Sequence, residues 1–371
     1  MGHVDGTVLT RPYPDAMLDE VRLTRFSHGA GCACKLGPAD LAQVLGLVGP
    51  SAKPPEVLVS EETGDDAAAY RLDEERALIA TVDVFTPVVD DPYDWGRIAA
   101  ANALSDVYAM GGEPALTLNV AGWPVDALPV DLLADVLRGG RDVAQQAGAA
   151  VVGGHTITTE KEPIYGMVAI GFAPPAALIR NDGLRPGMSL VLTKPLGIGI
   201  LTTAIKRDAA SPAQAGAAVT TMTTLNAAAA HAAREAGVRA GTDVTGFGLL
   251  GHLHRMCAAS GVAAVIDAGA VPLLEGVLLL AQRDVVPSGT KRNHAWLSPS
   301  VVWGDLTTPE QMILADAQTS GGLLLGTDDP AALVAALGTA AVIGRVTEGA
   351  AGTIAVDGRV RGEAAATTSA G

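Results

Sequence analysis

The stretch "TVDVFTPVVDDPYDWGRIAAANALSDVYAMGG", Thr81 to Gly112, places a short apolar segment directly before a long alanine-rich one. Its first part completes "ALIATVDVFTPVV", whose β-branched residues and flanking turns are typical of a strand. Its second part, "DWGRIAAANALSDVYAM", predicts a helix that stops at Gly111 and Gly112, because glycine suits the left-handed cap. The succession of strand and helix indicates an α/β fold.

The same alternation continues along the chain. A helix is predicted in "PADLAQVLGLV" and another in "VDLLADVLRGGRDVAQQAG", and strands are predicted in "DDAAAYRL", "ALTLNVAGW", "AAVVGGH" and "IYGMVAIGFA". One α/β domain would therefore end near Pro175. The turn "LRPG" and the segment "SLVLTK" then open a second sheet. In this second domain we expect helices at about 197–207, 213–236, 246–259 and 329–337, and strands at about 262–267, 321–326 and 341–347.

These elements divide the chain into four parts. A Gly-rich N-terminal arm (1–37) precedes two α/β domains with α+β-type layers (38–175 and 176–362), and a frayed tail (363–371) follows. We expect the arm to be mobile, because glycine is permissive in φ and loses most entropy on ordering.

Composition indicates a globular protein without nucleic-acid or membrane partners. The chain has 371 residues, of which 49% are hydrophobic, enough for two domains with real cores. Its 25 Lys and Arg residues against 40 Asp and Glu give a net charge of −15, which would repel a phosphate backbone. No apolar run approaches the roughly 18–20 residues of a membrane helix, and the N-terminus does not resemble a signal peptide, so we expect a cytoplasmic protein. Three cysteines cannot build a disulfide framework.

Two carboxylates stand out inside the predicted elements. Asp83 interrupts the apolar "IATVDVF" and must find a partner or a cation, since a charge buried alone is very costly. Asp106 follows Asn102 by four residues, so the two share one helix face. Asp106 also lies near the helix end, where the macrodipole disfavours a negative charge unless a cation compensates it.

Further carboxylates lie at the ends of predicted elements. Asp65 and Asp66 precede a strand, and Asp243 opens "TDVTGFG". Hard oxygen ligands of this kind suit Mg²⁺, which bridges one or two carboxylates to substrate phosphates. The carboxylates together therefore indicate a Mg²⁺-nucleotide site. Three other aspartates are interpreted as ordinary turn residues: Asp73, Asp90 and Asp91.

Four glycine clusters lie at predicted junctions: "VVGGHT", "KPLGIG", "VTGFGLLGH" and "QTSGGLLLG". The first places Gly153 and Gly154 just after a buried strand. None matches the Walker pattern or a clean GxGxxG, so each alone is more often a plain turn than a phosphate cradle. In "TDVTGFG", Thr242, Asp243 and Thr245 could all cap the helix that follows.

The histidines give no metal pair. His155, next to Gly154, could donate to a phosphate or be a satisfied turn residue. His252 and His254 are two apart on a predicted helix, so they do not face one direction.

The stretch "SHGAGCACKLGP", Ser27 to Pro38, places two cysteines and a lysine in a glycine-rich loop. A structural zinc site needs four N or S ligands, and the chain adds only the distant Cys257. A redox pair stays open but is not favoured, because the spacing is CxC rather than CxxC. Lys35 could lower the pKa of a nearby thiol or clamp a phosphate. A disordered loop with incidental cysteines is the remaining alternative.

Taken in order, these motifs resemble the selenophosphate synthetase family, the selenide, water dikinases. The likeness covers nearly the whole chain, from "LTRFSHGAGCACKL" through "TGDDAAAY", "GWP", "GGH" and "LTKPLGIGILTTA" to "DAQTSGGLLL". It implies that ATP, selenide and water give selenophosphate, AMP and phosphate, with more than one Mg²⁺ per ATP and usually K⁺. It also implies the fold of aminoimidazole ribonucleotide synthetase, a homodimer of two-domain subunits with ATP near the interface.

The resemblance implies the following roles in catalysis and metal binding. Cys32 falls on the position that is cysteine or selenocysteine in this family, Lys35 on its essential lysine, and Cys34 on a second, less critical cysteine. The expected Mg²⁺ ligands are Asp66, Asp106 and Asp243.

Nucleotide-binding positions are implied in the same way. At Gly64 the chain departs from bacterial members that have arginine there, and only a backbone N–H remains to contact ATP. The matching positions are Lys35, Thr63, Gly64, Asp65, Asp83 and Asp106, with Gly154, His155 and Thr156 of the partner subunit.

These roles give a mechanistic hypothesis and two alternatives. Cys32 would handle the selenium and Lys35 the transferring phosphoryl group, on an arm that closes over ATP as a lid. Thiamine-monophosphate kinases and hydrogenase-maturation dehydratases share the superfamily but lack the "SHGAGCACK" arm. A non-catalytic paralogue that binds nucleotide is disfavoured by the presence of Cys32, Lys35 and the aspartates.

Overall fold

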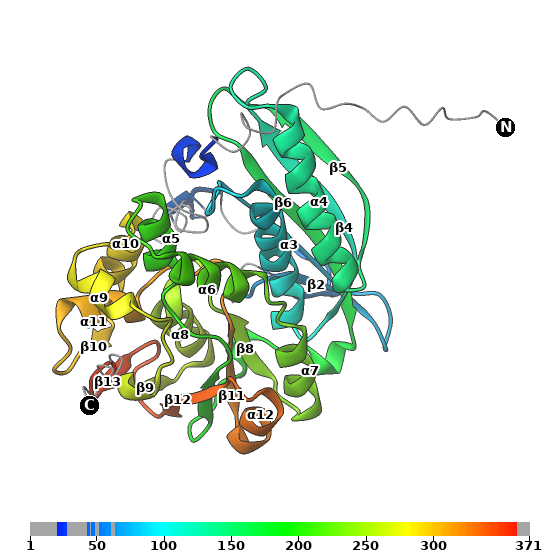
Figure 1. Cartoon of the computed structure of the whole chain (residues 1–371). Helices are drawn as coiled ribbons and strands as arrows, with labels where there is room; N and C mark the ends of the chain where they lie inside the picture. The colour runs from blue at the N-terminus through cyan, green and yellow to red at the C-terminus, as the bar shows by residue number, and fades with distance from the viewer. Residues whose placement is uncertain (1–20, 28–42, 45, 49–51, 61–63, 362–371) are drawn as a thin grey trace.

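Two β-sheets, one from each half of the chain, organise the molecule (Figure 1). The computed structural model describes residues 21–27, 43–44, 46–48, 52–60 and 64–361. Most of the predicted arm and the whole predicted tail lie outside these residues.

The first sheet has six strands in the order β1-β2-β3-β6-β4-β5. Only β4 and β5 are parallel, and the other neighbours are antiparallel. The strands predicted in the first domain are confirmed. Their bounds are β1 (Val57–Val59), β2 (Ala68–Arg71), β3 (Ala77–Phe85), β4 (Glu113–Trp123), β5 (Ala150–Thr158) and β6 (Ile164–Ala173).

Helices α3 (Pro92–Ala109) and α4 (Val130–Gln146) pack together against this sheet (Figure 1). Their backbones approach closely, since a Cβ on Gly96 of α3 would lie 1.9 Å from the Val136 carbonyl oxygen of α4. The predicted end of α3 is confirmed, because Gly111 has a φ of +75°.

The second sheet has seven strands in the order β10-β13-β9-β12-β7-β11-β8. Its strands are β7 (Ser189–Leu192), β8 (Ala240–Asp243), β9 (Ala263–Asp267), β10 (Val301–Val302), β11 (Leu323–Thr327), β12 (Ala341–Thr347) and β13 (Ile354–Asp357). Its helices are α5 (Ile198–Lys206), α6 (Pro212–Thr223), α7 (Ala227–Glu235), α8 (Gly248–Ser260), α9 (Val277–Gln282), α10 (Ser288–Leu297), α11 (Thr308–Leu314) and α12 (Pro330–Leu337). No helix in the described part of the chain has both the length and the apolar character needed to span a membrane.

The prediction of one helix over 213–236 is wrong, because the segment forms two helices, α6 and α7. Thr224, where α6 ends, is extended, and its carbonyl accepts a hydrogen bond from Lys194 Nζ at 2.6 Å. The extended backbone of Thr224 ends the helix, and Lys194 supplies a donor to a carbonyl that has no partner within α6. The other helices and strands predicted for this half are confirmed within about two residues.

Asp90 ties the segment 21–27 to the body of the protein. Its carboxylate forms an ion pair with Arg22 and accepts hydrogen bonds from Thr24 N at 3.0 Å and Thr24 Oγ1 at 2.7 Å. Arg22 also pairs with Asp208 at 2.7 Å. The interpretation of Asp90 as an ordinary turn residue is therefore wrong. Asp73 accepts backbone N–H groups in a turn, as predicted. Asp91 is instead the N-cap of α3 and accepts the backbone N–H of Asp94.

Replacing Asp90 with alanine should release this segment. Hydrogen bonds to charged groups contribute about 1.5–3 kcal/mol each, so we expect amide exchange at Thr24 to accelerate by at least about tenfold in hydrogen-exchange mass spectrometry. The matched Asp73→Ala variant, in an exposed turn, should leave residues 21–27 unchanged. Equal exchange in all three proteins would contradict the assignment.

Candidate functional site

Two side chains of α3 pair with two of β3. Alternate residues of a strand point to the same face, so Thr81 and Asp83 lie side by side, as do Asn102 and Asp106 one helical turn apart. Thr81 Oγ1 donates to Asp106 Oδ2 at 2.5 Å, and Asn102 Nδ2 donates to Asp83 Oδ2 at 2.6 Å. The predicted shared face is confirmed, and Asp83, which is only 5% exposed, has the partner that its burial requires.

The same helix reaches the second half of the chain. The Ser320 backbone N–H donates to Asn102 Oδ1 at 2.8 Å, and Ser105 Oγ donates to Asp243 Oδ2 at 2.6 Å. Asn226 Nδ2 in turn donates to Ser105 Oγ at 2.8 Å. All five residues are buried. Through α3, carboxylates distant in the sequence are gathered into one region.

Asp66 meets the end of β8. Thr242 Oγ1 donates to Asp66 Oδ1 at 2.8 Å, and the Asp243 backbone N–H donates to Asp66 Oδ2 at 3.3 Å. Burial, together with the negative charge of Asp243, raises the pKa of the Asp66 carboxyl well above its usual range. The Asp66 and Asp243 carboxylates therefore oppose each other across the two halves of the chain.

This donor set fits a divalent cation that also binds a ligand. Within the described residues, no three His, Cys, Asp or Glu side chains form a ready metal cluster. Mg²⁺, however, is usually held by one or two carboxylates, waters and substrate phosphates rather than by an all-protein cage. The side chains that could hold Mg²⁺ are those of Asp66, Asp243 and Asp106. Asp106 follows Ser105 in α3, and Ser105 donates to Asp243.

Gly64 and Asp65 are fixed to the segment that joins the two sheets. The Asn181 backbone N–H donates to Asp65 Oδ1 at 2.6 Å, and Asn181 Nδ2 donates to the Gly64 carbonyl at 2.7 Å. These contacts hold the loop before β2 in place, so that Asp66 is presented to β8.

We had expected side chains of the motif "TDVTGFG" to cap the helix that follows. They do not. Helix α8 begins at Gly248, and its N-cap residue, Phe247, makes no side-chain cap. Thr242 and Asp243 contact Asp66 and Ser105 instead. Tertiary contacts have replaced the local capping that the sequence suggested.

His252 supports this motif from α8. Its Nε2 accepts the Thr245 backbone N–H at 3.1 Å, and its Nδ1 lies 3.5 Å from Thr242 Oγ1. In a neutral imidazole the proton then resides on Nδ1 and points to Thr242. His254 makes a separate contact to the Gly352 carbonyl at 2.7 Å, so the two histidines have different partners.

Hydrogen bonds connect the motifs "KPLGIG" and "QTSGGLLLG". The backbone N–H groups of Gly197 and Ile198 donate to Gln318 Oε1 at 3.2 and 3.1 Å, and that of Ile200 donates to Asp316 Oδ2 at 3.2 Å. Donors used inside the protein are not available to a phosphate. The interpretation of "KPLGIG" as a structural turn is therefore confirmed.

Lys194, which sequence reasoning passed over, lies buried beneath the site. Its Nζ donates to the carbonyls of Thr224 at 2.6 Å and Ser320 at 2.9 Å. Burial lowers the pKa of Lys194 to about 7, although the charge of Asp243 opposes this shift. The only signal in the sequence was a lysine at the end of a buried strand.

Gly154, His155 and Thr156 lie far along β5, not after it. The prediction that Gly153 and Gly154 follow a buried strand is wrong, because β5 continues to Thr158 and is mostly exposed. Among the described residues β5 is hydrogen-bonded only to β4, so it forms an edge of the first sheet.

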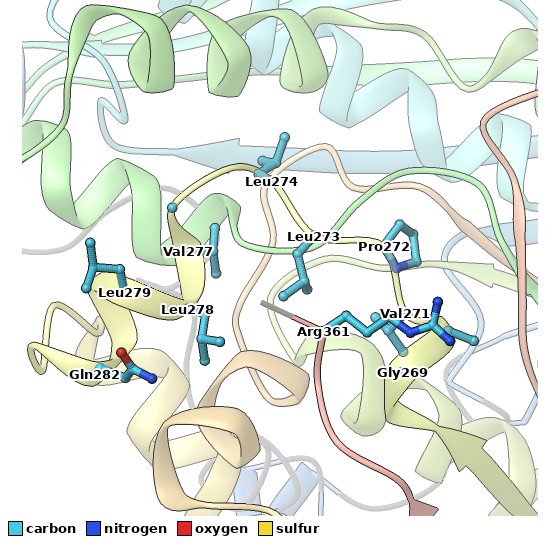
Figure 2. A pocket seen from close by; sticks show the side chains of 12 residues that line it. Gly269, Val271, Pro272, Leu273, Leu274, Val277, Leu278, Leu279, Gln282 and Arg361 are labelled. Carbon is cyan, nitrogen blue, oxygen red and sulfur yellow. The ribbon is translucent and has the colours of Figure 1, made fainter. Parts of the chain in front are cut away.

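A cavity of about 450 Å³ lies elsewhere, along η5 (Ala268–Ala270) and α9 (Figure 2). Its lining is mainly apolar, with Arg361 at one side. None of the predicted site residues lines it, so this cavity is separate from the carboxylates. Four predicted site residues lie outside the described residues: Cys32, Cys34, Lys35 and Thr63.

Comparison with known proteins defines the family of the chain. A model of the AIR synthase related protein N-terminal domain matches residues 64–173, and one of the C-terminal domain matches residues 185–357. A selenide, water dikinase of Burkholderia pseudomallei is 47% identical over 338 residues, which cover 89% of this chain and 95% of that protein. The chain belongs to the selenide, water dikinase family, within the AIR synthase related proteins.

Solved structures share the fold at lower identity. AaThiL, complexed with AMPPCP and TMP, is 21% identical with a TM-score of 0.64, covering 88% of this chain and 95% of that one. The hydrogenase maturation protein HypE in complex with ATP is 18% identical with a TM-score of 0.55, covering 92% and 90%. The expected aminoimidazole ribonucleotide synthetase-like fold is thereby confirmed.

Removing the charge of Asp66 should stabilise the metal-free protein. When folding raises the pKa of a carboxyl, the folded protein loses stability as the pH rises through that raised pKa. In EDTA at pH 8, Asp66→Asn should therefore melt about 2–4 °C higher than the wild type if about 1 kcal/mol is relieved, and the gap should shrink towards pH 4. Mg²⁺ should raise the Tm of the wild type more than that of the variant.

The control is Asp73→Asn, a carboxylate in an exposed turn, which should show neither effect. A lower Tm for Asp66→Asn than for the wild type in EDTA at pH 8, measured by scanning calorimetry, would contradict the charge opposition.

Proposed function

We propose that this chain catalyses the ATP-dependent synthesis of selenophosphate from selenide and water, with release of AMP and phosphate. The carrying observation is the 47% identity to a selenide, water dikinase over almost the full length of both proteins. The grouping of carboxylates around α3 agrees with this activity. The product would serve as selenium donor for selenoprotein or seleno-tRNA synthesis.

The carboxylates would hold the metal-nucleotide complex. Asp66, Asp106 and Asp243 are the proposed Mg²⁺ ligands, with Asp83 and Asp65 as nucleotide contacts. When bound, Mg²⁺ would neutralise part of the charge of the triphosphate, and K⁺ is a further candidate ion. Two phosphoryl transfers from one ATP need a rigidly held triphosphate, which the hydrogen-bonded positions of Asp83 and Asp106 support.

The residues of the arm would carry the selenium chemistry. We assign Cys32 to the handling of selenium, Lys35 to stabilisation of the transferring phosphoryl group, and Cys34 to a secondary role. A lysine near a thiol favours the thiolate, which is the nucleophilic form. The proposed division of the chain is an arm at 1–37, two domains at 38–175 and 176–362, and a tail at 363–371. We propose that the protein is located in the cytoplasm.

The edge strand β5 supports a homodimer. Edge strands of soluble proteins are usually short or protected, yet β5 has nine residues and exposes Val152 by 59% and Ile157 by 49%. A second copy of the chain would cover this edge. Gly154, His155 and Thr156 would then reach the nucleotide of the partner subunit.

Substitution of Cys32 tests the proposed activity. Supplied anaerobically with ATP, Mg²⁺ and selenide, the wild type should give AMP and a selenophosphate signal in phosphorus NMR. Cys32→Ser should lower selenophosphate formation by at least about a hundredfold, since a hydroxyl is a far weaker nucleophile than a thiolate. The matched Cys34→Ser variant should stay within about tenfold of the wild type.

Two outcomes would refute these assignments. ADP as the only product, or AMP formation that does not depend on selenide, would refute the activity. A Cys32→Ser variant with the wild-type rate would refute the role of Cys32 alone.

The dimer is tested by placing charges on the edge strand. The double variant Val152→Lys/Ile157→Lys should sediment as a monomer of 37.5 kDa, whereas the wild type should have twice that mass. Val302→Lys, which charges an exposed position on β10 of the other sheet, is the control and should remain dimeric. Identical masses for the wild type and the double variant would contradict the interface.

A further inference from the structure

Arg255 of α8 lies directly against Gly64. A Cβ built on Gly64 would lie 2.3 Å from Arg255 Nη2 and 2.8 Å from Arg255 Cζ. Such distances are too short for a side chain, so any residue other than glycine at position 64 would displace the guanidinium. Gly64 also has a φ of +66°, which favours glycine. Gly64 therefore leaves a space that Arg255 fills.

The Phe247 ring supports one face of the Arg255 guanidinium, but the N–H donors of this group are not used. Its Cζ lies 5.1 Å from the centre of the Phe247 ring, a cation–π contact that fixes the group on one side. In the described part of the chain, no hydrogen bond or ion pair of the Arg255 side chain is present. Five N–H donors in a planar fork thus remain available to a ligand.

Electrostatics place this cation beside the candidate metal carboxylates. Burial lowers the pKa of Arg255, and the charges of Asp66 and Asp65 act in the opposite direction. Both carboxylates are already engaged, Asp66 by Thr242 and Asp65 by Asn181. The guanidinium therefore lies within reach of the carboxylates without being paired to them.

An unpaired guanidinium beside carboxylates that suit a divalent cation matches a metal-bound polyphosphate. The metal neutralises part of the phosphate charge, and arginine binds phosphate oxygens with two parallel N–H donors. We propose that Arg255, whose guanidinium fills the space that Gly64 leaves, binds a phosphate group of the nucleotide at the Asp66 and Asp243 carboxylates. The identity of that nucleotide as ATP rests on the proposed function.

This assignment gives α8 a role in binding. The loop that carries Gly64 belongs to the first half of the chain, and Arg255 belongs to the second. A phosphate held by Arg255 and by a metal at Asp66 would link the two halves. Gly64 would contribute to nucleotide binding by having no side chain, in addition to its backbone N–H.

Calorimetric titration with AMPPCP and Mg²⁺, without selenide, tests the proposal. We expect Arg255→Gln to bind AMPPCP at least about tenfold more weakly than the wild type, and Arg255→Lys, which keeps the charge but not the fork, to lose less. Adenosine, which has no phosphate, should bind the wild type and Arg255→Gln equally. Arg138→Gln, an exposed arginine of α4, should behave as the wild type.

A second variant keeps Arg255 and changes only its surroundings. Gly64→Ala adds the Cβ that would displace the guanidinium, so it should also weaken AMPPCP binding while leaving adenosine binding unchanged. Wild-type affinity for AMPPCP in Arg255→Gln would overturn the proposal. So would a parallel loss of AMPPCP and adenosine binding in Arg255→Gln, since that pattern marks a structural role.

The outcome is independent of the selenium chemistry. A wild type that binds AMPPCP through Arg255 but makes no selenophosphate would refute the proposed function and leave the role of Arg255 intact.

Discussion

The side-chain amide of Asn102 determines how the two halves of the chain meet at the site. Its nitrogen donates to the Asp83 carboxylate, and its oxygen accepts the backbone N–H of Ser320. All three groups are buried, where an unpaired polar atom costs about 1–3 kcal/mol. An aspartate at this position would place a second carboxylate beside Asp83, and a leucine would leave both partners unpaired. The amide of asparagine satisfies both partners at once, because its nitrogen donates and its oxygen accepts.

This contact requires α3 to be buried on almost every side. Close packing is possible because Gly96 and Gly139 let α3 and α4 approach until backbone meets backbone. On the other sides, alanines keep the helix narrow enough to contact both β3 and the second half of the chain. Asn102 and Ser105 of α3 then lie where water cannot reach them, and Asp106 is half-buried. The hydrogen bonds of Asn102 and Ser105 must therefore be made by the protein, and this requirement orients the two side chains.

Local patterns predicted the parts of the site that are local. The strand with Asp83 and the helix with Asn102 and Asp106 follow from residue spacing, because the periods of strand and helix decide which side chains share a face. The joining of Asp66 to Asp243 does not follow from spacing, since these residues are 177 positions apart and meet only through the packing of the two sheets. The order of the motifs along the chain still indicated the family, because it can be compared with relatives without any knowledge of the contacts.

Two of the wrong expectations share one physical cause. Thr242 and Thr245 were assigned to a helix cap, and 213–236 to one helix, because both assignments depend on neighbouring residues alone. In the structure more distant groups take part in these hydrogen bonds: Asp66 accepts from the Thr242 hydroxyl, and Lys194 donates to the Thr224 carbonyl at the end of α6. Such contacts cannot be read from a propensity, since they depend on which groups the fold brings within 3 Å.

Asp66 shows how the site can be preformed and still require a ligand. Hydrogen bonds from Thr242 and the Asp243 backbone hold its carboxylate in position, while the Asp243 side chain opposes its negative charge. The hydrogen bonds set the geometry, and the opposed charges set the affinity for a cation. Any cation that binds both carboxylates removes this opposition and therefore stabilises the folded state by mass action. Because Asp66 belongs to the first half of the chain and Asp243 to the second, the same event tightens the contact between the two halves on which α3 depends.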